Sequence, residues 1–255
     1  MAADRTNVQG MSLDLPTPDG VADAYLAHPD DGRPHPGVLL YMDAFGLRPS
    51  LEAMARQLAG HGYTVLVPNV FHRSGRAPLV DLPDLIDPSQ RPEIFEQLGP
   101  VMAALTPALA MRDAGAYLDW LAAHPLVAEG PVGTTGYCMG GVLGIRTAAA
   151  YSERIAAAAS FHAGRLATDA EDSPHRLADR ITAELFFGHA DRDPSLPADQ
   201  IKRLEQTLDA AGVRYRSELY EGAHHGFTQT DTAAYDANAN DRHWHDLLEL
   251  FGRTL

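Results

Sequence analysis

Short apolar runs recur along the chain and carry the first prediction. Most are continuous rather than alternating, and Gly or Pro often lies at their ends. Such runs are typical of strands that are covered on both faces, as in a parallel sheet. We therefore expect strands at 38–42, 63–67, 131–135, 155–161, 184–187 and, with an alternating pattern, 214–220.

The segments between these runs repeat apolar residues at helical spacing. This predicts helices over 50–59, 106–123, 140–150, 197–211 and 233–252. Ser50 is the expected N-cap of the first helix and Gly212 the expected end of the fourth.

Strands that alternate with helices predict the α/β class. We expect one domain over residues 1–255, a three-layer α/β/α sandwich with a mostly parallel sheet. The segments 13–16 and 21–27 flank Pro18-Asp19-Gly20, which predicts an N-terminal hairpin at the sheet edge.

The stretch 71–107 interrupts this alternation and is rich in Pro and Asp. We interpret it as an insertion over the strand ends, with a short helix at 92–98. Long insertions of this kind often form lids or pocket walls, although a solvated excursion without function is the alternative.

Composition narrows the class of partner. The chain of 255 residues has 34 acidic and 20 basic side chains and a formal net charge of −14. This charge disfavours nucleic acid and anionic membrane surfaces. No apolar run reaches the length of a membrane-spanning helix, and residues 1–10 do not resemble a secretory signal. We expect a cytoplasmic monomer or homodimer that binds a small molecule.

Cys138 is the only cysteine and the nucleophile candidate. The motif Gly136-Tyr137-Cys138-Met139-Gly140-Gly141 follows a predicted strand and opens a predicted helix. This is the context of a nucleophile elbow, in which flanking glycines leave room for a sharp turn. A buried structural cysteine is the alternative interpretation.

A thiol nucleophile needs a histidine and a carboxylate that orients it. Asp191 and Asp193 follow the strand 184–187, and His224 and His225 follow the strand 214–220. Asp191 is preferred because it comes first after the strand end, and His225 because small residues and then Phe227 follow it. Asp193 and His224 remain the alternatives.

No metal or other cofactor is expected. The chain has no His-Glu-x-x-His or Cys-x-x-Cys spacing. His243 and His245 lie two residues apart on a predicted helix, so their side chains do not share a face.

These motifs resemble those of the dienelactone hydrolases (carboxymethylenebutenolidases), which have the α/β-hydrolase fold. The resemblance covers about residues 11–251. It includes the elbow, Gly188-x-x-Asp191, His225-Gly226-Phe227 and the stretches 41–46 and 62–69. It implies metal-independent hydrolysis of an ester or lactone by a Cys–His–Asp triad, through a thioester acyl-enzyme.

The resemblance also assigns roles to further residues. The backbone N–H groups of Ala44 and Met139 would form the oxyanion hole. Asp43 stands where the family usually has a Glu beside the thiol, and Gln229 stands where it has a second arginine. These departures predict weaker selection for anionic lactones and favour a neutral or larger ester. The resemblance implies a substrate-binding set of Asp43, Arg91, Phe95 and Gln229, to which the end of the strand 155–161 adds His162.

Two other functions compete with ester hydrolysis. A protein that binds a ligand without converting it would explain Asp43 and Gln229. A redox or electrophile sensor would use the Cys138 thiol, but the chain has no second cysteine that could resolve a sulfenic acid.

Overall fold

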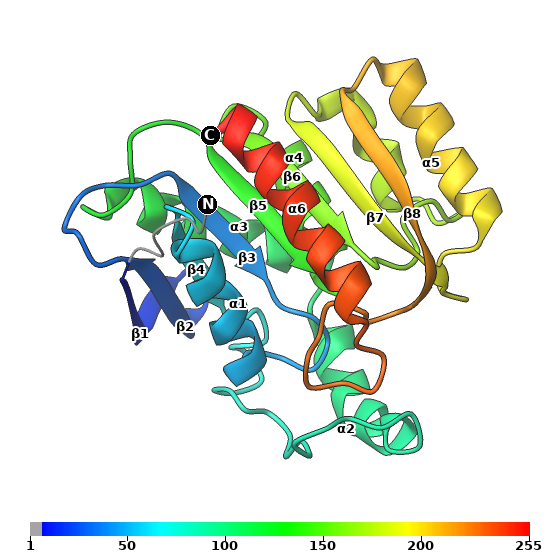
Figure 1. Cartoon of the computed structure of the whole chain (residues 1–255), viewed down its shortest axis with the longest axis horizontal. Coiled ribbons are helices and arrows are strands. Elements are labelled where there is room, and N and C mark those ends of the chain that lie inside the picture. The colour runs from blue at the N-terminus through cyan, green and yellow to red at the C-terminus, as the bar shows by residue number, and fades with distance from the viewer. Residues whose placement is uncertain (1–6) are drawn as a thin grey trace.

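A single eight-stranded sheet forms the centre of the molecule (Figure 1). The computed structural model describes residues 7–255. The strands follow the order β1-β2-β4-β3-β5-β6-β7-β8 across the sheet. Their bounds are β1 Val8–Thr17, β2 Gly20–Pro29, β3 Gly37–Tyr41, β4 Thr64–Pro68, β5 Val132–Tyr137, β6 Ile155–Phe161, β7 Glu184–Arg192 and β8 Tyr215–His224.

The expected N-terminal hairpin is confirmed. β1 and β2 pair antiparallel from Val8↔Pro29 to Thr17↔Gly20, and β1 lies at one edge of the sheet. β2 pairs antiparallel with β4, and every later pairing in the sheet is parallel. Every residue of β3, β4 and β5 is buried, which explains why β3 and β4 are continuous apolar runs.

Helices cover both faces of the sheet, as the three-layer prediction required. α1 packs on β2 and β4, and α6 packs on β6 and β7. α3 and α4 cover the opposite face, and α5 contacts η1, which also packs on α4. The helices are α1 Pro49–Ala59, α2 Arg91–Ala104, α3 Pro107–Ala123, α4 Met139–Ala150, η1 Pro174–Arg180, α5 Ala198–Ala211 and α6 Ala237–Thr254.

The predicted cap at Ser50 is wrong. α1 begins at Pro49, and Arg48 occupies the N-cap position without a side-chain capping bond. Proline has the backbone angle of a helix already fixed, so the helix begins two residues earlier than a cap at Ser50 implies. Gly212 ends α5 as expected, with φ 69° in the left-handed region.

The stretch 71–107 contains a longer helix than expected. Residues 71–90 form no helix and no named strand, and α2 then runs from Arg91 to Ala104 rather than over 92–98. Among residues 7–255, no single helix is long and apolar enough to cross a membrane. α2 and α3 reach that length and composition only as a pair bent by 78°.

Parallel strands place their carboxyl ends at one edge of the sheet, where ligands bind in open α/β sheets. Cys138 follows β5, His162 follows β6, Asp193 follows β7 and His225 follows β8. The topology therefore brings the candidate site residues to one edge.

Candidate active site

Cys138 occupies a strained turn between β5 and α4. Its φ is 55° and its ψ is −121°. A non-glycine residue with positive φ costs on the order of 1–3 kcal/mol, so the surrounding structure must hold it there. The Cys138 N–H donates to the carbonyl of Phe161 at 3.1 Å, and the carbonyl of Cys138 accepts from Gly141 N at 3.1 Å. The thiol is partly exposed, which excludes a structural cysteine buried in the core.

The flanking glycines are required by contact with backbone atoms. A Cβ on Gly136 would overlap the carbonyl of Gly140, and a Cβ on Gly140 would overlap the carbonyls of Tyr41 and Met42. α4 therefore begins close against β3 and β5, as the elbow motif predicted.

Asp193 rather than Asp191 orients the histidine. Nδ1 of His225 lies 2.6 Å from Oδ2 of Asp193, whose side chain is 3% exposed. Asp191 is exposed and its Oδ2 accepts from Gly222 N at 2.9 Å. The prediction of Asp191 is wrong because β7 continues to Arg192, so the first carboxylate beyond the strand is that of Asp193.

His225 is the histidine that lies beside the thiol. Burial lowers its pKa, but hydrogen bonds with Asp193 and Cys138 outweigh burial and raise the pKa from 6.5 to about 10. His224 is exposed. At neutral pH the free protein therefore contains His225 as an imidazolium next to Cys138.

Two backbone N–H groups near the thiol are unengaged. In the described part of the chain, neither Met139 N nor Ala44 N donates to a protein acceptor. Met139 is the first residue of α4, where backbone N–H groups lack a partner within the helix. Asp43 fixes the loop around Ala44, because its Oδ1 accepts from Phe45 N at 2.9 Å and its carbonyl accepts from Gly46 N at 3.2 Å.

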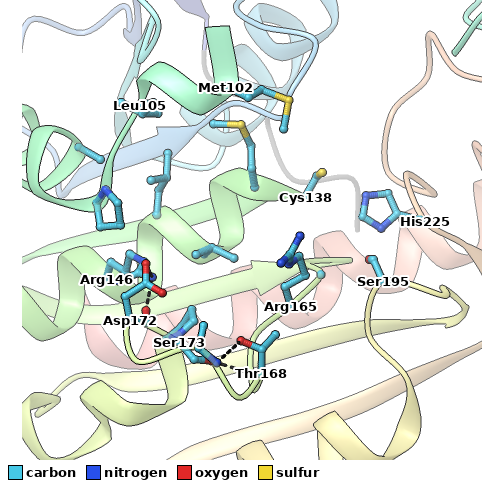
Figure 2. Close-up of a pocket in the computed structure, with 18 residues that line it drawn as sticks. Met102, Leu105, Cys138, Arg146, Arg165, Thr168, Asp172, Ser173, Ser195 and His225 are labelled. Carbon is cyan, nitrogen blue, oxygen red and sulfur yellow. Dashed lines mark hydrogen bonds and ion pairs between the residues drawn. The ribbon is translucent and has the colours of Figure 1, made fainter. Parts of the chain in front are cut away.

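A cavity of about 490 Å³ borders His225, Asp193 and Arg91 but not Cys138. Two others border both Cys138 and His225. One is small, about 90 Å³, and contains all five residues predicted to bind substrate. Its walls are Asp43, Ala44, Phe45, Arg91, Phe95, Cys138, His162, His225, Gly226, Gln229 and Thr232. The other is about 490 Å³ and is bounded by α2, α3, α4 and the stretch 164–174 (Figure 2).

Asp43 does not present a free carboxylate to the thiol. Its two oxygens accept from Nη1 and Nη2 of Arg48 at 2.7 and 2.9 Å. Arg48 also bonds Asp231, with Nε 2.5 Å from Oδ2. Burial lowers the pKa of Arg48, but Asp43 and Asp231 raise it above its ordinary value, so the guanidinium stays charged. The two carboxylates leave this buried cluster with one net negative charge.

Gln229 is held by the same cluster. Its Oε1 accepts from Arg48 Nη2 at 3.4 Å and its Nε2 donates to Thr228 Oγ1 at 3.2 Å. Arg91 is the cation of the small pocket. It lies 5.9 Å from the ring centre of Phe45 and, among residues 7–255, has no carboxylate within ion-pair distance.

His162 is a second, neutral histidine beside His225. Their ring centres are 5.2 Å apart, and Nε2 of His162 lies 2.8 Å from Thr228 Oγ1. Burial lowers the pKa of His162 well below its ordinary value. Its Nδ1 is buried and has no partner in the described part of the chain. Its φ is 40°, and that of Arg165 nearby is 58°.

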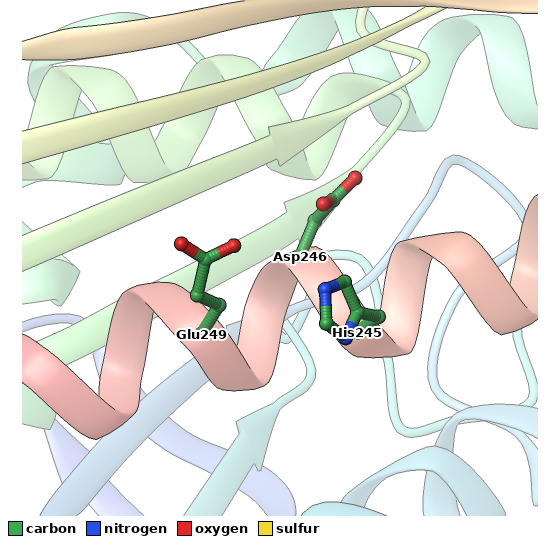
Figure 3. A group of neighbouring side chains, drawn as sticks. All are labelled: His245, Asp246 and Glu249. Carbon is green, nitrogen blue, oxygen red and sulfur yellow. The ribbon is translucent and has the colours of Figure 1, made fainter.

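Three side chains on α6 lie close enough together to bind a metal ion, but their carboxylates already have other partners. His245, Asp246 and Glu249 lie on one face of α6 (Figure 3). Asp246 accepts from Tyr220 at 2.7 Å, and Glu249 pairs with Arg216 at 2.8 Å. The carboxylates are thus already committed, and we assign this cluster no metal.

Comparison with known proteins agrees with the fold and the motifs. The model of the dienelactone hydrolase family matches residues 22–255. The chain belongs to the dienelactone hydrolase family. Membership supports an enzyme that acts on esters or lactones.

Individual members of the family are distant in sequence. A putative carboxymethylenebutenolidase of Methylorubrum extorquens is 26% identical over 255 residues, which cover 98% of this chain and 83% of the relative. The carboxymethylenebutenolidase of Rhodococcus opacus is 28% identical over 222 residues, 86% of this chain and 81% of the relative. The crystal structure of a putative dienelactone hydrolase from Klebsiella pneumoniae has a TM-score of 0.84 at 22% identity, covering 97% of this chain and 99% of that one.

Several site residues were missed by the sequence reasoning. Phe45, Arg48 and Asp231 shape the small pocket, and Arg165 and Ser195 line the large one. Arg48 and Asp231 are separated by 183 residues, so no local pattern connects them. The sequence indicates Asp193 only as the alternative to Asp191.

Proposed function

We propose that the protein hydrolyses a carboxylic ester or lactone with Cys138 as nucleophile, His225 as proton carrier and Asp193 as the orienting carboxylate. The observation that carries the proposal is the chain of contacts from Asp193 through His225 to the Cys138 thiol at the elbow. A thiolate is the reactive form of cysteine, and the neighbouring imidazolium stabilises its charge.

The first half of the reaction forms a thioester. The Cys138 sulfur attacks the carbonyl carbon, and the oxyanion accepts from the N–H groups of Met139 and Ala44. Each such donor lowers the barrier by on the order of 3 kcal/mol. The C–O bond to the alcohol then breaks, and the departing oxygen takes the proton from His225.

The second half releases the acid. His225, now neutral, removes a proton from a water molecule that attacks the thioester carbonyl. The C–S bond breaks, sulfur leaves as thiolate and His225 is again an imidazolium. Asp193 holds the imidazole in one tautomer throughout, because its carboxylate accepts from Nδ1.

Arg91 lines the small pocket, and its positive charge suits this pocket to a polar or anionic substituent of the substrate. The negative Asp43–Arg48–Asp231 cluster and the uncharged Gln229 oppose a second negative charge there. Substrates with one such substituent or none therefore fit better than strongly anionic lactones.

The direct test compares the wild type with Cys138→Ala on p-nitrophenyl acetate and on a dienelactone. We expect turnover by the wild type, loss of at least 10³-fold in the variant, and a mass increase of one acyl group on Cys138 in rapidly quenched samples. His224→Gln is the matched control and should retain activity. Equal turnover by Cys138→Ala, or a ligand that protects Cys138 without being consumed while no ester reacts, would favour the non-catalytic alternative.

A further inference from the structure

The larger cavity at Cys138 is lined mainly by apolar side chains from separate parts of the chain. The end of α2 and the start of α3 contribute one wall and α4 contributes another. Figure 2 shows Cys138 and His225 at one end of this space and Arg146 with Asp172 at the other. The apolar lining consists of Met102, Leu105, Pro107, Ala110, Met139, Val142, Leu143, Ala170 and Pro174.

The charges around this cavity do not require a charged occupant. Arg146 donates to the carbonyl of Asp172, and its guanidinium lies 3.6 Å from that carboxylate. The pair is therefore neutral as a unit. Arg165 is exposed, so its guanidinium remains hydrated while its stem borders the cavity.

Size separates the two cavities more sharply than charge does. An apolar cavity of roughly 150 Å³ is enough for a benzene ring. The small pocket, about 90 Å³, is below that volume, whereas the large one is about 490 Å³ and within the usual range for ligand sites.

We propose that the substrate ester carries a bulky apolar group of at least about six carbon atoms, which occupies the large cavity while the smaller, more polar part faces Arg91. This inference rests on the proposed ester hydrolysis. It names the part of the substrate that the large cavity recognises.

The first experiment measures chain-length selectivity on both sides of the ester bond. One series varies the acyl group from p-nitrophenyl acetate to octanoate, and the other varies the alcohol from ethyl to octyl acetate. Each methylene buried in an apolar site contributes a factor of about three to four, so kcat/KM should rise on the order of 100-fold from butyrate to octanoate or over the matching alcohols. A rise in either series supports the inference and shows which side occupies the cavity. Flat or falling values in both series overturn it.

Two variants at matched apolar positions test whether the apolar group of the substrate binds in the large cavity. Val142 is partly exposed on α4 and lines the cavity, whereas Val101 is partly exposed on α2 and lines neither pocket at Cys138. Val142→Phe should lower kcat/KM for the long ester at least tenfold more than for the acetate. Val101→Phe should leave this ratio unchanged. If Val142→Phe and Val101→Phe behave alike while both remain folded by circular dichroism, the cavity is not the binding site.

Alkylation of Cys138 by iodoacetamide separates this inference from the proposed function, because it needs no turnover. Octan-1-ol should slow alkylation of the wild type at concentrations at which butan-1-ol has no effect, and Val142→Phe should remove this difference. Protection without any ester hydrolysis would mean that the proposed function fails and the apolar site stands. Hydrolysis of p-nitrophenyl acetate, with neither protection by octan-1-ol nor chain-length selectivity, would mean that the proposed function stands and the apolar site fails.

Discussion

Nδ1 of His225 lies 2.6 Å from Oδ2 of Asp193, and Asp193 is itself fixed by Ser195, whose N and Oγ donate to Oδ1 at 2.9 and 2.6 Å. One carboxylate oxygen of Asp193 therefore contacts His225, and the other accepts the two hydrogen bonds from Ser195. This arrangement sets both the direction of the imidazole ring and its affinity for a proton.

Replacing Asp193 with Asn should keep the shape of the contact and remove its charge. We expect kcat to fall on the order of 10²–10⁴-fold, because the amide supports the wrong tautomer. The pKa of His225 should fall from about 10 toward its ordinary value. Ester kinetics and proton NMR of the imidazole measure the two effects.

Asp191→Asn is the matched control. It removes the same charge two positions earlier in the chain, from an exposed side chain that bonds Gly222 N. Its kcat should remain within about twofold of the wild type. Comparable losses in Asp191→Asn and Asp193→Asn would contradict the assignment.

Stability should depend on pH through His225. Its pKa in the folded protein, about 10, is above the unfolded value of 6.5, so protonation stabilises the folded state. The contribution is complete below pH 6.5 and is lost as pH rises through 10. Urea unfolding of the wild type and His225→Gln should show the largest difference near pH 6, shrinking toward pH 10. A constant gap between the wild type and His225→Gln across this pH range would refute the linkage.

Gly140 is the second position at which a small change should have a large effect. Gly140→Ala places a Cβ against the carbonyls of Tyr41 and Met42, which are backbone atoms and cannot rotate away. We expect a loss of about 1–3 kcal/mol in the free energy of unfolding and a fall in activity, because α4 and the loop around Ala44 must separate.

Gly99→Ala provides the comparison. Gly99 is inside α2, and a Cβ there meets no atom within 4 Å. Alanine in a helix is favoured over glycine, so this variant should gain up to about 1 kcal/mol. Thermal or urea unfolding measures both changes, and a stable Gly140→Ala would show that the elbow is not tightly packed.

Asp43→Asn should separate the electrostatic role of the buried cluster from its structural role. The substitution makes the cluster neutral but leaves Arg48 paired with Asp231. We expect a loss of about 1–3 kcal/mol of stability from the weakened buried contacts. The ratio of kcat/KM for an anionic ester to that for a neutral ester of equal size should rise. An unchanged ratio would mean that the cluster does not influence charge selection.

The fold was predictable because it depends on burial, which marks the sequence directly. β6 has the predicted bounds, Ile155 to Phe161, since both its faces are covered and its residues are correspondingly apolar. The end of β7 was not predictable in this way. His189, Asp191 and Arg192 are polar, but after an irregularity between Ala190 and Arg192 the pairing with β8 resumes at Arg192↔His224. Hydrogen bonds between backbones extended the strand, and this extension made Asp191 the wrong choice.

The pockets depend on contacts that a sequence does not mark. Arg48 and Asp231 meet across 183 residues, and the large cavity joins α2, α4 and the stretch 164–174. Packing between elements, rather than any motif, brings these residues together. Cys138 and His225 were identifiable because each directly follows a strand and belongs to a compact motif.

Cys138, His162 and Arg165 all have a positive φ, which L-amino acids adopt reluctantly, with values of 55°, 40° and 58°. Each costs roughly 1–3 kcal/mol, against a total of only about 5–15 kcal/mol for a typical domain. Glycine would relieve this cost at the exposed Arg165. At His162, which is buried and bonded to Thr228, the void left by glycine would offset the relief. A stabilising substitution is therefore available at Arg165, where it would remove a side chain that lines the large cavity.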